Sequence, residues 1–111
     1  MTFEEASTKA LNFREERDWS QFHNPKDLAI SISLEAAELL ETFQWSGTNL
    51  KPNEKRDSMA EELADIAIYC IYLANALDVD LAEAISAKID ANAKKYPVDK
   101  SRGCSKKYTE L

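Results

Sequence analysis

The sequence has few of the residues that interrupt helices: its 111 residues include only 2 glycines and 3 prolines. Glycine and proline mark turns and break regular helices, so their scarcity argues against a protein rich in strands and tight turns. Alanine, leucine, glutamate and lysine are abundant instead, and all four favour helices. With 44% hydrophobic residues, the chain can also form a core. We therefore expect one all-α domain.

Histidine and cysteine are also scarce, with 1 histidine and 2 cysteines. The single histidine, His23, lies in a predicted loop, whereas di-iron helical bundles need an ExxH pair on each of two helices. No group of His and Cys residues has the spacing of a zinc site. Cys70 and Cys104 form no CxxC motif, and we expect a reduced, cytoplasmic chain.

The chain lacks a long apolar run and an excess of positive charge. Its longest apolar stretch, IAIYCIYLANAL, is too short to cross a bilayer, and the charged first residues, MTFEEASTKALNFREER, do not resemble a signal peptide. A net charge of −6 argues against non-specific nucleic-acid binding. We expect neither membrane association nor a stable nucleic-acid complex.

Helix-capping residues and apolar spacing predict four helices, at residues 3–18, 25–45, 54–77 and 81–96. The predicted caps are Thr2 with Glu5, Asn24 before Pro25, and Asp80 with Glu83. Short connections favour antiparallel neighbours, so we expect a four-helix bundle. Such apolar helices on a short chain leave faces exposed, which predicts a dimer or tetramer.

The last residues differ in composition from the predicted bundle. After Pro97 the chain is polar and basic, which predicts an extended or mobile tail. We therefore divide the sequence into a helical domain at residues 1–96 and a C-terminal tail at residues 97–111.

Two short acidic pairs are the most informative motifs. Glu35 and Glu38 stand in LEAAEL, and Glu62 and Asp65 stand in EELADI. Residues three apart share one face of a helix, and each pair adjoins the apolar stripe of its helix. Four converging carboxylates cannot all stay ionised without positive charge. Oxygen ligands alone suit Mg²⁺, or Mn²⁺ in its place, so the four acids are candidate metal ligands.

An ordinary solvated surface is the alternative reading of each acidic pair, because glutamate and aspartate are common on helices. A solvated acidic face, however, would lie opposite the apolar stripe rather than beside it. Glu41 belongs to the same run and could support the metal, whereas Glu61 points further round its helix and is expected to be solvated.

The ordered motifs resemble the MazG-like nucleoside triphosphate pyrophosphohydrolases, whose signature is ExxE, a spacer and ExxD. Here the signature reads EAAE at Glu35–Glu38 and ELAD at Glu62–Asp65. The segments RDWSQFHNPKDLA, ETFQW, EELADIAIY, KIDANAKKYPV and SRGCSKKYTEL are similar to the dCTP pyrophosphatase branch of that family. The resemblance extends over residues 3–111.

This resemblance implies an all-α fold that assembles as a dimer or a dimer of dimers. It also implies Mg²⁺-dependent cleavage of a dNTP, such as dCTP or 5-modified dCTP, into the monophosphate and pyrophosphate. The biological role would be the removal of surplus or non-canonical nucleotides. By motif position, Glu35, Glu38, Glu62 and Asp65 would be the catalytic and metal-binding residues.

Aromatic and basic residues complete the predicted substrate site. Trp19, His23 and Trp45 flank the second predicted helix, and Tyr69 follows Asp65 by one turn, so that these side chains could contact the base or the sugar. Basic and amide side chains for the phosphates or the sugar are Lys88, Asn92 and Lys95 on one helix stripe, and Arg102 in the tail.

Three other functions remain open from the sequence. A dUTPase-like enzyme or a phosphoribosyl-ATP pyrophosphatase would use a similar cluster of acidic residues but recognise a different base. A non-catalytic helical dimer that binds a partner protein would use the helices without the metal.

Overall fold

The computed structural model describes residues 1–111, which form five α-helices, three 3₁₀ helices and no strand. The prediction of an all-α fold is therefore confirmed. The α-helices are α1 (Phe3–Glu16), α2 (Pro25–Glu41), α3 (Arg56–Ala76), α4 (Leu81–Lys95) and α5 (Val98–Ser101). The 3₁₀ helices are η1 (Ser20–Phe22), η2 (Asn53–Lys55) and η3 (Tyr108–Glu110).

The predicted N-terminal caps are present at three of the helices. Backbone N–H groups donate to the cap side chains, Glu5 to Thr2 at 3.1 Å, Asp27 to Asn24 at 2.9 Å and Glu83 to Asp80 at 3.2 Å. Each bond satisfies one N–H group that the first helical turn leaves without an intrahelical partner. The caps set the starting points of α1, α2 and α4.

The C-terminus of α1 forms a turn that brings Trp19 back toward the helix. Asp18 has a left-handed backbone (φ 53°), its N–H donates to the Glu15 carbonyl at 3.0 Å, and the Trp19 N–H donates to the Arg14 carbonyl at 3.1 Å. These two bonds are those of a Schellman motif with aspartate in the position that glycine usually takes. The helix therefore ends two residues before the predicted Asp18.

The second helix is shorter than predicted, because α2 ends at Glu41 rather than at Trp45. The Thr42 hydroxyl donates to the Leu39 carbonyl at 2.7 Å, and the N–H of the same residue donates to that carbonyl at 3.1 Å. A threonine that binds the backbone in this way competes with the regular helix ladder. Residues 42–45 continue only as turns, and Trp45 then adopts a left-handed backbone (φ 71°).

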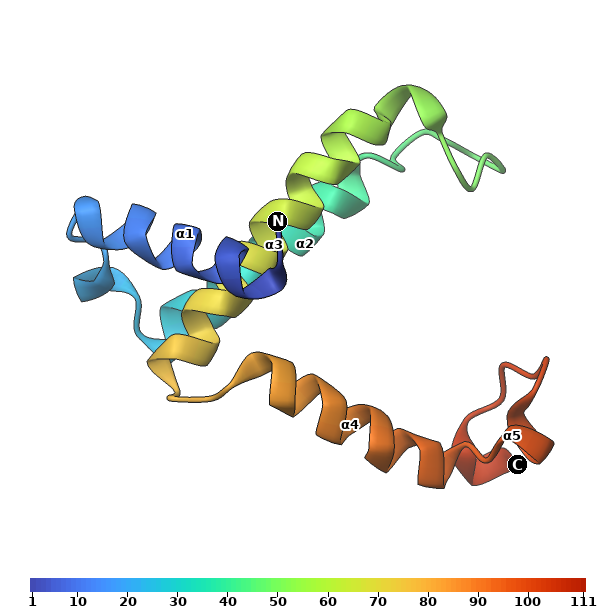
Figure 1. Cartoon of the computed structure of the whole chain (residues 1–111). Helices are drawn as coiled ribbons and strands as arrows, with labels where there is room; N and C mark the ends of the chain where they lie inside the picture. Colours follow the sequence, from blue (N-terminus) through green and yellow to red (C-terminus); the bar gives the residue numbers. More distant parts are fainter. The chain divides into compact units, whose positions relative to one another are not determined.

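The first 78 residues form a compact unit, Met1–Asp78. In it α2 and α3 lie side by side and antiparallel, and α1 packs against α3 (Figure 1). The small core contains Leu28 of α2, which is 1% exposed, with Ile71, Tyr72 and Ala74 of α3. Both acidic motifs lie on this helix pair, one on α2 and the other on α3.

The second compact unit is Val79–Leu111, which contains α4, α5 and η3. The tail, residues 97–111, was expected to be extended or mobile; it contains the short helices α5 and η3 and turns back along the end of α4. The Tyr96 and Tyr108 rings meet edge to face with their centroids 6.0 Å apart, and the Ser101 hydroxyl donates to the Pro97 carbonyl at 2.7 Å. The tail and α4 thus belong to one unit.

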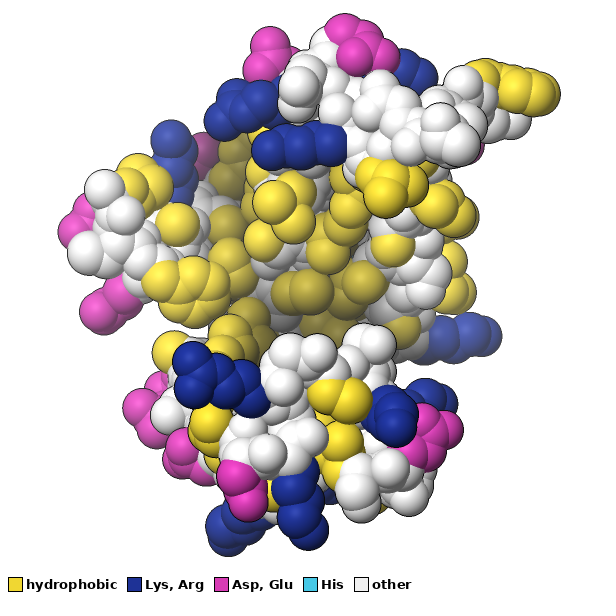
Figure 2. All heavy atoms as spheres, turned by 90° about the vertical axis from the view of Figure 1, so that its right-hand side faces the viewer, with side chains coloured by type: hydrophobic (Ala, Val, Ile, Leu, Met, Phe, Trp, Pro, Cys, Tyr) yellow, Lys and Arg dark blue, Asp and Glu magenta, His cyan; other side chains and the backbone are white.

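Many large apolar side chains remain exposed, and part of them is visible in the space-filling view (Figure 2). On α2, Ile30 is 48% exposed and Leu34, one turn further, is 60% exposed. On α4, Ile85 and Ile89 form a similar pair at 49% and 61% exposure. None of the helices is long and apolar enough to span a membrane.

Candidate functional site

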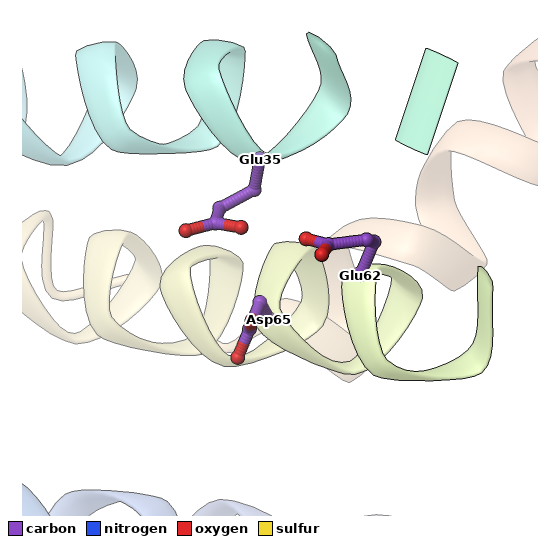
Figure 3. A group of neighbouring side chains, drawn as sticks. All are labelled: Glu35, Glu62 and Asp65. Carbon is purple, nitrogen blue, oxygen red and sulfur yellow. The ribbon is translucent and has the colours of Figure 1, made fainter. Parts of the chain in front are cut away.

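Three carboxylates converge between α2 and α3. One carboxylate oxygen from each of Glu35, Glu62 and Asp65 lies within 4.8 Å of the other two. Figure 3 shows Glu35 extending from α2 toward α3, and Glu62 turning its carboxylate back toward Glu35. Asp65 comes from the next turn of α3. The antiparallel pairing of two helices is what brings together acids that are distant in the sequence.

The pKa values of two of these acids are raised. A hydrogen bond with Glu38, followed by burial and by a hydrogen bond with Glu35, raises the pKa of Glu62 to about 7. Burial is the largest cause that raises the pKa of Glu35, and a hydrogen bond with Glu38 adds to it, while a hydrogen bond with Glu62 acts in the opposite direction. Like charges at this separation disfavour the ionised forms of Glu35 and Glu62 in the absence of a cation.

The cluster also contains polar atoms that the protein does not satisfy. The Oε2 atoms of Glu35 and Glu62 are buried and have no hydrogen-bond partner. A buried carboxylate oxygen without a partner carries a desolvation cost, which a bound cation would offset. Because every donor atom in the cluster is a carboxylate oxygen, the residues fit a hard divalent cation such as Mg²⁺ or Mn²⁺.

Glu38 lies beside the three acids but is not part of the closest group. It lines a neighbouring cavity of about 410 Å³ with Glu41, Thr42, Lys55, Ser58 and Glu62. Glu62 therefore belongs both to the closest group, with Glu35, and to the wall of this cavity, with Glu38. The four predicted acids are thus all near one another, with Glu41 at the edge of the group.

A pocket of about 560 Å³ adjoins the acids within the first unit. Its wall combines acidic, aromatic and aliphatic side chains, namely Met1, Ala6, Lys9, Ala10, Phe13, Trp19, His23, Glu35, Asp65, Ile68, Tyr69 and Tyr72. A mostly apolar pocket with a few polar groups, of this size, is typical of small-molecule sites. Trp19, His23 and Tyr69, all predicted from the sequence, share it with two of the acids.

His23 is held in the pocket wall by aromatic contacts. Its ring stacks on that of Tyr72, with centroids 4.9 Å apart and an interplanar angle of 24°, and Tyr69 meets both rings edge to face. Burial, followed by the charge of Arg14, lowers the pKa of His23, while the charge of Glu15 opposes them. The imidazole is therefore neutral near pH 7, with one donor and one acceptor nitrogen.

The remaining predicted residues are Trp45 and four residues of the second unit. Trp45 does not line this pocket: it follows α2 and is 91% exposed. The residues predicted to bind phosphate or sugar are all exposed and belong to the second unit; they are Lys88, Asn92, Lys95 and Arg102. Lys95 places its Nζ 4.9 Å from the centroid of the Tyr108 ring.

Sequence reasoning missed several side chains of the two cavities. Lys9 and Phe13 of α1 line the larger one, and Lys55 lines the smaller one. Ala6, Lys9, Ala10 and Phe13 have the spacing of one helix face. The apolar members of this face were the signal in the sequence that could have indicated it. No comparable pattern marked Lys55, because it precedes α3 in a polar segment.

Comparison with known proteins agrees with this geometry. The sequence model of the MazG-like family matches residues 30–111. The chain is 41% identical over 115 residues to dCTP pyrophosphatase 1 of Mus musculus, covering 99% of this chain and 68% of the mouse protein. It is 40% identical over 116 residues to dCTP pyrophosphatase 1 of Homo sapiens, again covering 99% of this chain and 68% of the relative.

A solved structure is also similar. The crystal structure of a pyrophosphatase from Archaeoglobus fulgidus superposes with a TM-score of 0.76 at 41% sequence identity, over 85% of this chain and 91% of the archaeal one. Fold and acidic motifs define an all-helical protein with a carboxylate cluster between two antiparallel helices. The chain belongs to the MazG-like family, as its motifs predicted.

Proposed function

We propose that this chain hydrolyses deoxynucleoside triphosphates between the α- and β-phosphates, releasing a monophosphate and pyrophosphate. The preferred substrates are dCTP and 5-modified dCTP, and the role is the removal of surplus or non-canonical nucleotides. Support comes from the relatives named dCTP pyrophosphatase 1, and from the archaeal structure named a pyrophosphatase.

One observation carries the proposal: the acids and the aromatic wall share a single pocket. Glu35 and Asp65 line the same cavity as Trp19, His23 and Tyr69. Aromatic rings can stack on a base, and a neutral imidazole can form a hydrogen bond with its edge. The acids can hold the divalent cation that would neutralise the charge of the phosphates. A nucleotide is a ligand that needs both halves of such a pocket.

Glu35, Glu38, Glu62 and Asp65 would hold Mg²⁺, with Mn²⁺ as a substitute. A bound divalent cation supplies charge neutralisation at the phosphates and a water molecule of lowered pKa. The carboxylates orient that centre, and one of them, or Glu41, accepts the proton of the attacking water.

The proposed substrate contacts divide by chemistry. Trp19, His23 and Tyr69 contact the base or the sugar in the pocket, and Trp45 contributes a further aromatic ring. The phosphates and the sugar are bound by the residues of the second unit predicted above: Lys88, Asn92, Lys95 and Arg102. Two unpaired cysteines, Cys70 and Cys104, support a reducing, cytoplasmic location.

The active form is a dimer or a dimer of dimers. Exposed apolar pairs on α2 and α4 support this proposal, because soluble monomers seldom leave such faces open to water. The net charge of −6 disfavours stable binding of nucleic acid, because the phosphate backbone is also negatively charged.

The test is ³¹P NMR of the purified protein with a panel of dNTPs and modified dCTPs, with and without Mg²⁺. We expect metal-dependent formation of pyrophosphate and a monophosphate, fastest for dCTP or a 5-modified dCTP. Fastest turnover of dUTP or of phosphoribosyl-ATP would contradict the base preference. No turnover by folded, metal-loaded protein, together with a melting temperature unaffected by Mg²⁺ and nucleotide, would contradict the enzyme assignment.

A further inference from the structure

One charged side chain behind the pocket has no part in the proposed chemistry. Arg14 is only 6% exposed, and it is the single charged residue in the buried set. Burial of a guanidinium is costly unless its donors are bound, so a buried arginine normally has a defined task. Arg14 does not line the pocket itself.

The side chain of Arg14 is tied to α3 and to the next residue of its own helix, α1. One of its terminal nitrogens donates to Asn75 Oδ1 on α3 at 3.0 Å, and its Nε donates to Glu15 Oε1 at 3.0 Å. Its guanidinium carbon lies 5.3 Å from the centroid of the Tyr72 ring, within the range of a cation–π contact. The planar fork of arginine suits this set of contacts, which a lysine could not reproduce.

Through Tyr72 these contacts reach the pocket wall. Tyr72 is 4% exposed, and its hydroxyl donates to the Ala10 carbonyl at 2.8 Å, which fixes the ring between α1 and α3. The face of that ring carries the stacked His23 imidazole at 4.9 Å. Any displacement of Tyr72 would therefore move His23.

The backbone of Arg14 reaches a second side of the same pocket. Its carbonyl accepts the Trp19 N–H at 3.1 Å, in the turn that ends α1. The Trp19 ring then meets Phe13 edge to face at 5.7 Å. One residue thus connects two aromatic walls that come from different segments.

We propose that Arg14 is a positioning residue for the base pocket: its guanidinium holds the Tyr72–His23 stack so that the His23 ring meets the base in one geometry, beside the Trp19 turn that its main-chain carbonyl helps to close. That the pocket binds a base rests on the proposed function, whereas the arrangement of the side chains is observed in the structure. Because Arg14 touches neither the acids nor the pocket, its effect passes through other residues.

The electrostatic setting of His23 agrees with this role. Burial and the nearby Arg14 charge lower the pKa of His23, and Glu15 raises it. Other ionisable groups that share its surroundings are the hydroxyls of Tyr69 and Tyr72 and, along the pocket wall, Lys9, Glu35 and Asp65. A neutral imidazole can both donate to and accept from a base edge, whereas a protonated one can only donate.

The first test needs no turnover, because His23 is the only histidine in the chain and its ring signals need no assignment. We would titrate full-length wild type, Arg14→Met and Arg14→Lys by NMR. The control for loss of a nearby positive charge is Arg17→Met at the C-cap of α1, where the guanidinium lies over Phe13 at 3.7 Å and 5.9 Å from the Trp19 ring, but has no aromatic contact with His23 or Tyr72.

In Arg14→Met the His23 titration is expected to move to higher pH, and its ring signals should lose part of the shift caused by Tyr72. Arg14→Lys should keep the lowered midpoint but not the ring geometry, and Arg17→Met should behave as wild type. An unchanged His23 titration and unchanged ring signals in folded Arg14→Met would overturn the proposal. If Arg14→Met does not fold, Asn75→Ala, which frees the guanidinium, decides by the same signals.

Steady-state kinetics then separates positioning from mere structural support. For Arg14→Met we expect KM for dCTP to rise about tenfold with kcat little changed, and the rise to be larger at acid pH. Arg14→Lys should recover part of the loss. A fall in kcat with KM and its pH profile unchanged would contradict the proposal. Absence of any nucleotide turnover in wild type would instead reject the proposed function and leave the NMR result readable.

Discussion

At the scale of single residues, Glu62 is the acid on which the candidate site depends most. It interacts with both Glu35 and Glu38, and its Oε2 atom is buried without a partner. Replacing Glu62 by Gln removes one anionic ligand but keeps the size of the side chain. We expect kcat/KM to fall by at least about 100-fold while the circular dichroism spectrum stays helical.

The matched control for this variant is Glu61→Gln, which makes the same change of charge one position earlier. Glu61 is exposed and lies outside the acidic group. Its substitution should leave activity within about twofold of wild type, as expected for a surface position. Equal losses in the two variants, or retained activity in Glu62→Gln, would remove the metal-site assignment.

The raised pKa of Glu62 also predicts how the stability of metal-free protein depends on pH. The folded pKa is about 7 and the reference value is 4.5, so between these pH values the folded state holds a proton that the unfolded state has lost. The free energy of unfolding should therefore fall as pH rises from about 4.5 through 7. Thermal denaturation in EDTA at several pH values measures this slope.

Mg²⁺ should act in the opposite direction, because it binds the ionised carboxylates. The increase in melting temperature on adding Mg²⁺ is expected to be larger at pH 8 than at pH 6. In Glu62→Gln both the pH slope and the Mg²⁺ effect should shrink. A Mg²⁺ effect of the same size at both pH values would contradict a cation site formed by these acids.

Three of the acids singled out in the sequence lie together in the structure, whereas the contacts around them were not indicated. Glu35, Glu62 and Asp65 could be found because a three-residue spacing beside an apolar stripe is visible in one dimension. The Arg14–Asn75 bond, in contrast, joins residues from two helices, and no local spacing indicates it. Such a contact between side chains distant in the sequence can be predicted only when the packing of α1 on α3 is known.

At the scale of helices and turns, the starts were predicted more accurately than the ends. Thr2, Asn24 and Asp80 act as caps through short local hydrogen bonds, which sequence alone can indicate. The ends depend on less regular features. The early end of α2 arises from the Thr42 hydroxyl bonded to Leu39, and the end of α1 arises from Asp18 in a left-handed conformation.

The turn after α2 contains a strained residue that can be tested. Trp45 has a φ of 71°, in a region that side chains other than glycine and asparagine rarely adopt. Trp45→Gly and Trp45→Ala both remove the ring, but only glycine removes the steric conflict of Cβ. We expect the glycine variant to be more stable than the alanine variant by about 1 kcal/mol, measured by urea denaturation.

Activity of the same two variants examines the proposed substrate contact. If the Trp45 ring touches the nucleotide, both variants should show the same increase in KM, because both lack the ring. A larger increase in Trp45→Ala alone would assign the effect to the backbone of the turn. Equal stability of the two variants would show that Trp45 is not strained.

At the scale of the whole molecule, the predicted apolar stripes were only partly buried. Leu28 of α2 is 1% exposed, whereas the apolar residues Leu63 and Leu77 of α3 are 61% and 53% exposed. Periodicity identifies which residues are apolar on one face but not what covers that face. Partners outside the chain are therefore beyond what one sequence can specify.

The exposed pair on α2 gives the most direct test of self-association. Ile30 and Leu34 lie one helical turn apart and are 48% and 60% exposed, so a second copy of the chain could cover both. Burial of apolar surface contributes about 25 cal/mol per Å², and a buried carboxylate placed within that surface would oppose association strongly. Leu34→Asp should therefore shift the oligomer toward the monomer.

The control is Ser33→Asp, which adds the same charge at the neighbouring, exposed polar position. By size-exclusion chromatography with light scattering, wild type and Ser33→Asp should have at least twice the mass of one chain, and Leu34→Asp should approach the mass of one chain. A wild-type monomer at all concentrations would contradict the proposed dimer. A Leu34→Asp oligomer as stable as wild type would place the interface on other faces, because a carboxylate cannot remain buried and unpaired at no cost.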